Sequence, residues 1–176
     1  MIAPSTSLGI AQAALSVWVT FAFPLAADPL ARPEGRVILT VTGEIGVTNS
    51  VDGTAAEFDL AMLRALGESE IVTDTIWTPD TSHFTGIRLK TLLDLLEADA
   101  EKIEAAAIND YRVEIPITDA TEDGPILAYA MDGALMSRRD KGPLWLIYPY
   151  ASSSDYRTEV IYSRSIWQLD RMILGK

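Results

Sequence analysis

From residue 36 to the end of the chain, alternating strand-like segments are interspersed with a few helical patterns. Arg36–Gly43 is rich in β-branched residues and ends at a glycine, which predicts a strand. Asp59 is a predicted helix N-cap, because a carboxylate there can accept a hydrogen bond from the first turn and leucines follow at helical spacing. The clearest helix is predicted over Ile87–Ala98, where leucines recur at positions i, i+3, i+4 and i+7.

The remaining segments lack helical periodicity and are expected to be strands or loops. Further strands are expected at Thr54–Phe58, Glu70–Trp77, Ile103–Ile108, Arg112–Ile115, Ile126–Met131, Leu144–Tyr148 and Ser165–Leu174. A loop is expected at Thr78–Gly86, a loop with a short helix at Ala151–Tyr162, and a tight turn at Asp132-Gly133. Together these elements predict an α+β fold made of β-rich mixed sheets with a few helices.

The first 27 residues differ in composition from the rest of the chain. Residues 1–27 carry no charged side chain, and Pro24–Ala27 ends in small residues that a signal peptidase could cleave. Two interpretations fit this pattern, a cleaved signal peptide and an uncleaved membrane anchor, and Pro24 together with scattered polar residues favours the signal peptide. In either case we expect residues 28–176 to form a single domain outside the inner membrane, in the periplasm.

Composition excludes several classes of function. The net charge is −11, from 14 basic and 25 acidic side chains, whereas nucleic-acid binders need a basic surface, so no nucleic-acid partner is expected. The chain has no cysteine, which rules out disulfides, cysteine-ligated zinc, iron–sulfur clusters and thiol nucleophiles. Since His83 is the only histidine, a histidine-rich metal site is excluded as well, and no bound metal is expected.

The most basic stretch of this acidic chain is Met136–Tyr150. Three cations flank Asp140 there, and Gly142 follows at the entry to a predicted strand. The three cations are Arg138, Arg139 and Lys141. A glycine lets the backbone approach a ligand, and arginine offers a planar set of donors to an anion or an acceptor-rich ring. The alternative is a surface turn in which Arg–Asp pairs have no role beyond the hairpin.

Two further segments could contact a flat ligand. Trp77 precedes a predicted loop that contains His83, and its indole could stack on a heteroaromatic ring. Alternatively, Trp77 is a core residue and His83 a solvated one. The run Asn109, Asp110 and Tyr111 could bind the edge of such a ring, or could simply form a tight turn. The residues alone leave both alternatives open.

Taken in order, these segments resemble the sulfite-oxidase-type molybdopterin-binding domain, in particular its cysteine-free exported branch. The resemblance runs from about residue 37 to residue 174. It is carried by FDLAMLRAL (58–66), FTGIRLKTLLDLL (84–96), AINDYRVEIPITDA (107–120), ILAYAMDGALMSRRDKGPLWLIYP (126–149) and YSRSIWQLDRM (162–172). The resemblance implies a sulfite-oxidase-like fold with a pocket for a pterin or molybdopterin.

The chain departs from this family at the residues that would hold a molybdenum cofactor. In the family, one cysteine ligates the metal at the end of the strand before the leucine-rich helix; the corresponding region here is Thr75–Trp77, without a cysteine. A thiolate is the soft ligand that such a metal site requires. The basic residues that bind the cofactor's phosphate in the family are replaced too, by Leu144, Trp145, Leu146 and Ile166. The pterin pocket is what the fold could retain.

Exported, cysteine-free members of the family include pterin-binding regulators of membrane receptors, such as those that make and degrade cyclic-di-GMP. The resemblance therefore implies a non-catalytic periplasmic protein that binds an unconjugated, reduced pterin and regulates a membrane signalling receptor. Two alternatives remain: a molybdopterin-dependent oxidoreductase that works without a cysteine ligand, and an interaction module with an empty pocket. The expected pterin-binding residues are Trp77, Asn109, Asp110, Tyr111, Ser137, Arg138, Asp140, Lys141 and Trp145.

Overall fold

A computed structural model describes residues 30–176 of the chain. The predicted signal peptide over residues 1–27 lies outside these described residues. Within residues 30–176, no helix combines the length and the apolar character that crossing a membrane requires. The strands are β1 (Leu39–Gly43), β2 (Ala55–Phe58), β3 (Ser69–Thr73), β4 (Ser82–Arg88), β5 (Lys102–Ala107), β6 (Arg112–Pro116), β7 (Ile126–Met131), β8 (Ala134–Leu135), β9 (Leu144–Ile147) and β10 (Trp167–Gly175). The helices are α1 (Leu60–Ala65), α2 (Leu89–Leu95), α3 (Glu159–Arg164) and the short 3-10 helices η1 (Ile117–Asp119) and η2 (Ser154–Tyr156).

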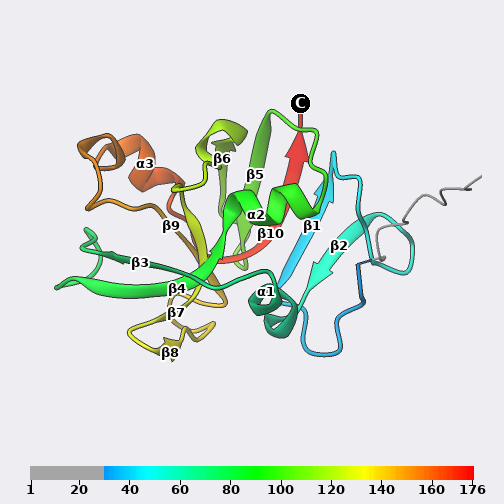
Figure 1. Ribbon diagram of the computed structural model, residues 1–176, viewed down its shortest axis with the longest axis horizontal. Helices are drawn as coiled ribbons and strands as arrows, with labels where there is room; N and C mark the ends of the chain where they lie inside the picture. Colours follow the sequence, from blue (N-terminus) through cyan, green and yellow to red (C-terminus); the bar gives the residue numbers. More distant parts are fainter. Residues whose placement is uncertain (1–29) are drawn as a thin grey trace, which may run out of the picture.

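The ten strands form one mixed, curled sheet with the order β2-β1-β10-β9-β7-β4-β3, to which β5, β6 and β8 are attached. Only β1 and β10 are parallel, and every other pair in residues 30–176 is antiparallel. Figure 1 shows β3 and β4 at one end of the molecule and β1 and β2 at the other. The α+β fold with mixed, β-rich sheet structure is therefore confirmed.

Strand β10 organises this sheet because it changes partners along its length. Its first residues pair with β9, and the residues that follow pair with β1 on one side and β5 on the other. The register shifts between Trp167 and Leu169, and the intervening Gln168 has a φ of 53°. Such an irregularity bends a strand and increases its twist. It also interrupts the regular alternation of side chains between the two faces of the sheet at the start of β10.

Two expected boundaries around Trp77 are wrong. The strand expected to reach residue 77 ends at Thr73, because the backbone then turns and the Oγ1 atom of Thr75 accepts hydrogen bonds from the N–H groups of Trp77 and Thr78. The loop expected over residues 78–86 is wrong in its second half, where β4 pairs with β3 and β7. Its polar residues and Gly86 are typical of a loop, yet the glycine is needed because a Cβ there would collide with the Leu127 carbonyl group of β7.

The predicted leucine-rich helix is shorter than expected. Ile87 and Arg88 still pair with β7, so α2 begins only at Leu89. It ends at Leu95, and the left-handed backbone of Glu97, with a φ of 49°, then turns the chain. The predicted apolar stripe is confirmed, since Leu89, Leu92, Leu93 and Leu96 are all buried.

The predicted N-cap at Asp59 is confirmed. Its Oδ1 atom accepts a hydrogen bond from the Met62 N–H at 2.9 Å, and its Oδ2 atom accepts one from the Gly35 N–H at 2.7 Å. These backbone hydrogen bonds lower the pKa of the Asp59 carboxyl group below its usual value, because they stabilise the charged form. One side chain thereby caps α1 and ties the start of the described chain to it.

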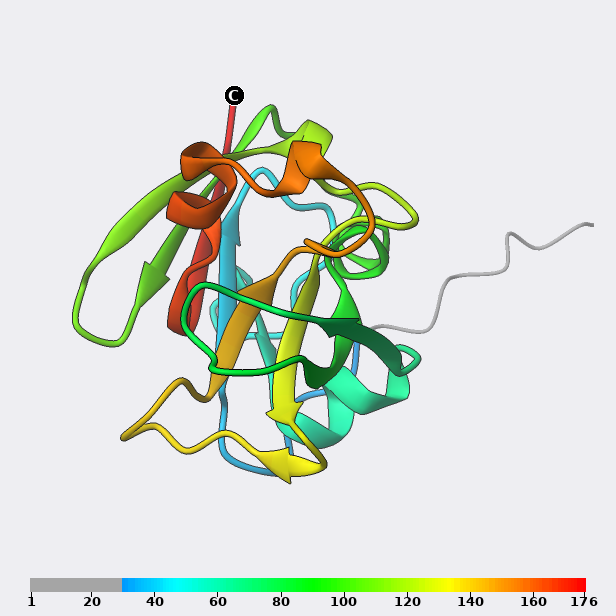
Figure 2. The ribbon, with the colours of Figure 1, turned by 90° about the vertical axis from the view of Figure 1, so that its left-hand side faces the viewer.

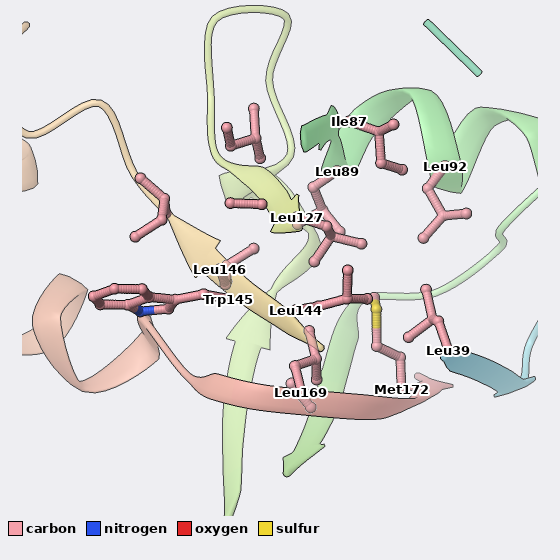
Figure 3. Close-up of a cluster of buried hydrophobic side chains, with 14 of the residues drawn as sticks. Leu39, Ile87, Leu89, Leu92, Leu127, Leu144, Trp145, Leu146, Leu169 and Met172 are labelled. Carbon is pink, nitrogen blue, oxygen red and sulfur yellow. The ribbon is translucent and has the colours of Figure 1, made fainter. Parts of the chain in front are cut away.

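The aliphatic core lies between α2 and the centre of the sheet. Figure 3 shows Ile87, Leu89 and Leu92 from one side meeting Leu127, Leu144 and Leu169 from the sheet. All of these side chains are at most 1% exposed. Burying an aliphatic side chain of this size contributes about 1.5–3 kcal/mol, so this cluster is a main source of stability for the fold.

Candidate functional site

A cavity of about 340 Å³ lies on the other side of β9 and β10 from much of this core. Figure 2 faces this part of the molecule, where α3, the β5–β6 hairpin and the loop between β3 and β4 surround the start of β10. The lining residues are Trp77, Ala107, Asn109, Tyr111, Tyr162, Ser163, Ser165, Ile166, Trp167 and Gln168. None of these lining residues, all within residues 30–176, carries a charge. The cavity is therefore polar in places but electrically neutral.

Trp77 is the centre of an aromatic cluster beside the cavity. Its ring centroid lies 5.8 Å from that of Trp145, 5.7 Å from that of Tyr162 and 5.8 Å from that of Trp167. All three contacts are edge-to-face, with interplanar angles of 63°, 86° and 75°. This is a favourable geometry for aromatic rings. Trp77 remains partly exposed, so part of its surface can contact a ligand.

Hydrogen bonds from a distant segment anchor the loop that carries Trp77. The guanidinium group of Arg157 donates to both carboxylate oxygens of Asp74, at 2.7 and 3.0 Å, and to the backbone carbonyl of Tyr150 at 2.8 Å. The hydrogen bond from Arg157 lowers the pKa of the Asp74 carboxyl group below its usual value. A two-pronged arginine contact fixes direction as well as distance. The Trp77 loop is thus held against the segment that leads into α3.

A partly buried polar network anchors α3 on the opposite side of the cavity. The Tyr148 hydroxyl donates to Asp119 at 2.7 Å, and Arg164 of α3 donates to the same carboxylate at 3.0 and 3.2 Å. Burial, followed by the contact with Asp119, raises the pKa of Tyr148 well above its usual value. Since α3 carries Tyr162 and Ser163, this network positions one wall of the cavity.

A second buried contact fixes the segment between α3 and β10. The Tyr150 hydroxyl donates to the Ser165 Oγ atom at 2.5 Å, and that hydroxyl in turn donates to the carbonyl of Ile161 at 2.8 Å. Burial raises the pKa of Tyr150 to about 12. Because Ser165 lines the cavity but has both donor and acceptor engaged, it contributes shape rather than a free polar group.

Two carboxamides are among the cavity's neutral polar groups. Asn109 lies in the turn between β5 and β6, and Gln168 lies at the irregularity of β10. The backbone N–H of Ile108 donates to the carbonyl of Gln168 at 2.9 Å, so the two segments run side by side at this point. Both residues line the cavity from neighbouring parts of the sheet.

The structure brings only some of the expected site residues together. Trp77, Asn109 and Tyr111 line the cavity. Lys141 lies next to it, with its Nζ atom 3.8 Å from the ring centroid of Trp167. Trp145, expected as an alternative stacking surface, is completely buried under the cluster and offers no surface to a ligand.

The other expected residues lie outside the cavity lining. Asp110 is paired with Arg171 at 2.9 Å, and 72% of its side chain is exposed. Ser137, Arg138 and Asp140 do not line the cavity, although the backbone carbonyls of Arg138 and Asp140 accept hydrogen bonds from Gln168. Arg138 and Asp140 therefore contact this lining residue through their main chain.

Gly142 has a structural role within its own hairpin. A Cβ atom at this position would collide with the carbonyl of Met136, and the N–H of Gly142 donates to the carbonyl of Ser137 at 2.8 Å. The glycine is required by the close approach of two parts of the same hairpin. His83, the only histidine, lies on β4 and its Nδ1 atom is 3.2 Å from Glu70, away from the residues that line the cavity.

Sequence reasoning missed three residues that shape the cavity: Tyr162, Trp167 and Gln168. Tyr162 falls in a segment expected to be mostly loop, and Trp167 follows the regular pattern of a predicted strand. The sequence signal that could have identified Trp167 and Gln168 is a tryptophan followed directly by a glutamine at the start of the last predicted strand. Only the pairing of β10 with β9 shows that both face a common space.

A family model described as the oxidoreductase molybdopterin binding domain matches residues 51–155. The chain belongs to this family. No curated protein matches the chain. The matched range contains the lining residues Trp77, Asn109 and Tyr111. It ends before α3 and β10, which carry other lining residues.

The residues of the cavity do not fit the complete molybdenum cofactor of this family. The chain has no cysteine, so no thiolate can ligate the metal. The cofactor's phosphate needs cationic partners, whereas the lining residues of the cavity are all uncharged. Lys141, the cation beside the cavity, lies over the Trp167 ring. The neutral aromatic lining suits the pterin part of the cofactor, and not its metal or phosphate.

Proposed function

We propose that this protein binds an unconjugated, reduced pterin without metal and does not catalyse a reaction on it. One observation carries the proposal: the cavity of about 340 Å³ combines aromatic walls with neutral polar groups and contains no charged lining residue among residues 30–176. Cavities of this size hold small organic ligands. A pterin is flat, uncharged at neutral pH and bordered by hydrogen-bond donors and acceptors, which matches this lining.

The proposal also covers the cellular location of the protein and its partner. The uncharged segment over residues 1–27 supports export to the periplasm. A ligand-binding domain without catalytic machinery can act only by presenting its bound or unbound form to another molecule. We therefore extend the proposal to regulation of a membrane signalling receptor with a periplasmic sensing domain, for which a cyclic-di-GMP enzyme is an example.

The two alternatives make different demands on the site. An oxidoreductase would need a metal ligand to replace the thiolate and cations for the phosphate, and the cavity lining provides neither. An interaction module without a ligand would need bulky side chains to fill the pocket, whereas the cavity is open. The pterin-binding proposal is the one that requires no addition to the residues of the site.

The decisive experiment identifies the ligand on protein exported by a bacterial host able to make molybdopterin. Mass spectrometry and fluorescence of the extracted ligand are combined with a molybdenum measurement on the same sample. A pterin without molybdenum supports the proposal. One equivalent of molybdenum overturns it in favour of the oxidoreductase, and the absence of both, followed by no binding of added pterin, favours the interaction module.

Substitution of Trp77 tests where the pterin binds. We expect Trp77→Ala to weaken pterin binding by at least about tenfold, because one stacked aromatic contact contributes roughly 1–3 kcal/mol. Trp77→Phe retains a flat ring and should retain most of the affinity. Titration calorimetry on folded protein measures both.

Leu135→Ala is the control for the Trp77 variants, because it removes an exposed apolar side chain on β8 that does not line the cavity. We expect this variant to bind pterin as the unchanged protein does. If Trp77→Ala binds pterin within twofold of the unchanged protein, the assignment of the ligand to this cavity is wrong.

A further inference from the structure

The carboxamide of Gln168 is held in one orientation. Its Nε2 atom donates to the carbonyl oxygens of Arg138 and Asp140, each at 3.0 Å. A carbonyl oxygen can only accept, so the nitrogen must face these two groups and the Oε1 atom must face the other way. Within residues 30–176, the Oε1 atom has no hydrogen-bond donor assigned to it. It is an acceptor without an assigned partner on a residue that lines the cavity.

The backbone of Gln168 indicates that this orientation is imposed by the fold. Its φ of 53° is uncommon for a residue with a side chain. Its N–H donates to the carbonyl of Lys141 and its carbonyl accepts from Ile108, both at 2.9 Å. Residues held in this way, with backbone strain, are concentrated at ligand sites.

The carboxamide of Asn109 has the opposite orientation. Its Oδ1 atom accepts a hydrogen bond from the backbone N–H of Tyr111 at 3.1 Å. A backbone N–H can only donate, so the oxygen faces the turn and the Nδ2 group is the available donor. Asn109 also lines the cavity, next to the strand that carries Gln168.

Asn109 and Gln168 therefore offer one donor and one acceptor, both uncharged and both oriented by hydrogen bonds to the main chain. We propose that Asn109 and Gln168 recognise the lactam edge of a ring, in which a C=O accepts from the Asn109 Nδ2 atom and the adjacent ring N–H donates to the Gln168 Oε1 atom. This inference rests on the proposed function, and it adds which edge of the pterin is recognised and by which residues. Pterin carries such an edge at its C4 oxygen and N3 hydrogen.

A matched ligand pair tests this recognition. In 2,4-diaminopteridine the same edge is reversed, with an amino donor at C4 and a ring acceptor at N3, while ring size and aromatic surface are almost unchanged. The amino group at C4, a donor, would then face the Asn109 Nδ2 donor. The ring acceptor N3 would face the Gln168 Oε1 acceptor. We expect pterin to bind the full chain at least about tenfold more tightly than 2,4-diaminopteridine at pH 7, because unpaired polar groups in a site built for hydrogen bonding are strongly disfavoured.

Asn109→Asp tests the donor within the protein. Aspartate has the same shape and keeps an oxygen for the Tyr111 N–H, but it places a second oxygen where the Nδ2 group was. We expect it to weaken pterin binding about tenfold and to reduce or reverse the preference over 2,4-diaminopteridine. The control is Ala61→Asp, which adds the same charge at an exposed position of α1, remote from the lining residues. It should leave the preference between the two ligands unchanged.

The outcomes separate this inference from the proposed function. Tight pterin binding with the expected preference, lost in Asn109→Asp, supports both. Equal binding of the two ligands, or an unchanged preference in Asn109→Asp, overturns the lactam recognition and leaves pterin binding in place. Failure of both ligands to bind the unchanged protein overturns the proposed function and the inference with it.

Discussion

Two clusters of buried side chains share strand β9 and pack in different ways. Leu144 belongs to the aliphatic cluster under α2, whereas its neighbour Trp145 belongs to the aromatic cluster beside the cavity (Figure 3). Neighbouring residues of a strand point to opposite faces, so one strand serves both clusters. The aliphatic side chains close on one another, while the aromatic rings meet edge-to-face and leave a cavity of about 340 Å³.

The difference follows from the shapes of the side chains. Aliphatic side chains have several rotamers and interdigitate at high density. Indole and phenol rings are rigid plates; here the Trp77 ring meets its neighbours at angles of 63° to 86°, and the cavity lies beside them. One side of the sheet thereby provides stability and the other a binding space. The following three changes test this division, from the largest expected effect to the smallest.

The aliphatic cluster should determine stability and leave ligand binding unchanged. Leu92 of α2 has no exposed surface, so Leu92→Ala leaves a cavity and should lower the free energy of unfolding by about 2–5 kcal/mol. Urea denaturation measures this loss. Pterin affinity of the folded variant should stay within twofold. A loss below about 2 kcal/mol, the lower end of this range, would show that this cluster is loosely packed.

The aromatic side should make the protein sensitive to alkaline pH. Burial raises the pKa of Tyr150 from an ordinary value of 10 to about 12. Between these values the unfolded chain loses the phenolic proton while the folded chain keeps it, so the stabilisation present below pH 10 is lost as the pH rises. The expected loss is about 2 kcal/mol by pH 12 for this group.

Tyr150→Phe tests this assignment, because it removes the ionisable group and keeps the ring. Urea denaturation of the variant at several pH values from 9 to 12 should show a shallower fall in the free energy of unfolding. The fall should not vanish, because burial also raises the pKa of Tyr148. An unchanged slope would mean that Tyr150 ionises as easily in the folded chain as in the unfolded one.

The hydrogen bonds that anchor α3 should affect both stability and ligand binding, each by a small amount. Tyr148→Phe removes the hydroxyl group that donates to Asp119 and leaves Arg164 as the remaining partner in that network. The free energy of unfolding should fall by about 1–3 kcal/mol, the usual range for a hydrogen bond to a charged group. Pterin affinity should fall a few-fold, because α3 carries part of the cavity wall. Unchanged affinity with reduced stability would place the network outside the binding site.

Much of this architecture could be predicted from local patterns. The leucine stripe of α2, the cap at Asp59 and the strand at Ile126–Met131 each depend on residues close together in the chain. The order of the segments also indicated the family, which the match over residues 51–155 shows. Trp77, Asn109 and Tyr111 were expected near a ligand, and they do line one cavity.

Tertiary structure alone decided the rest of the site. Trp145 and Trp167 are the same residue type at the start of predicted strands, yet one is fully buried and the other is 37% exposed and lines the cavity. Their environments follow from the pairing of β9 with β10, which joins residues far apart in the chain. The same pairing gives Gln168 its left-handed backbone and places two main-chain carbonyls against its amide. The periodicity of the sequence indicates which face of a helix or strand is apolar. Burial, cavity shape and the direction of a carboxamide depend on which distant segments pack against that face.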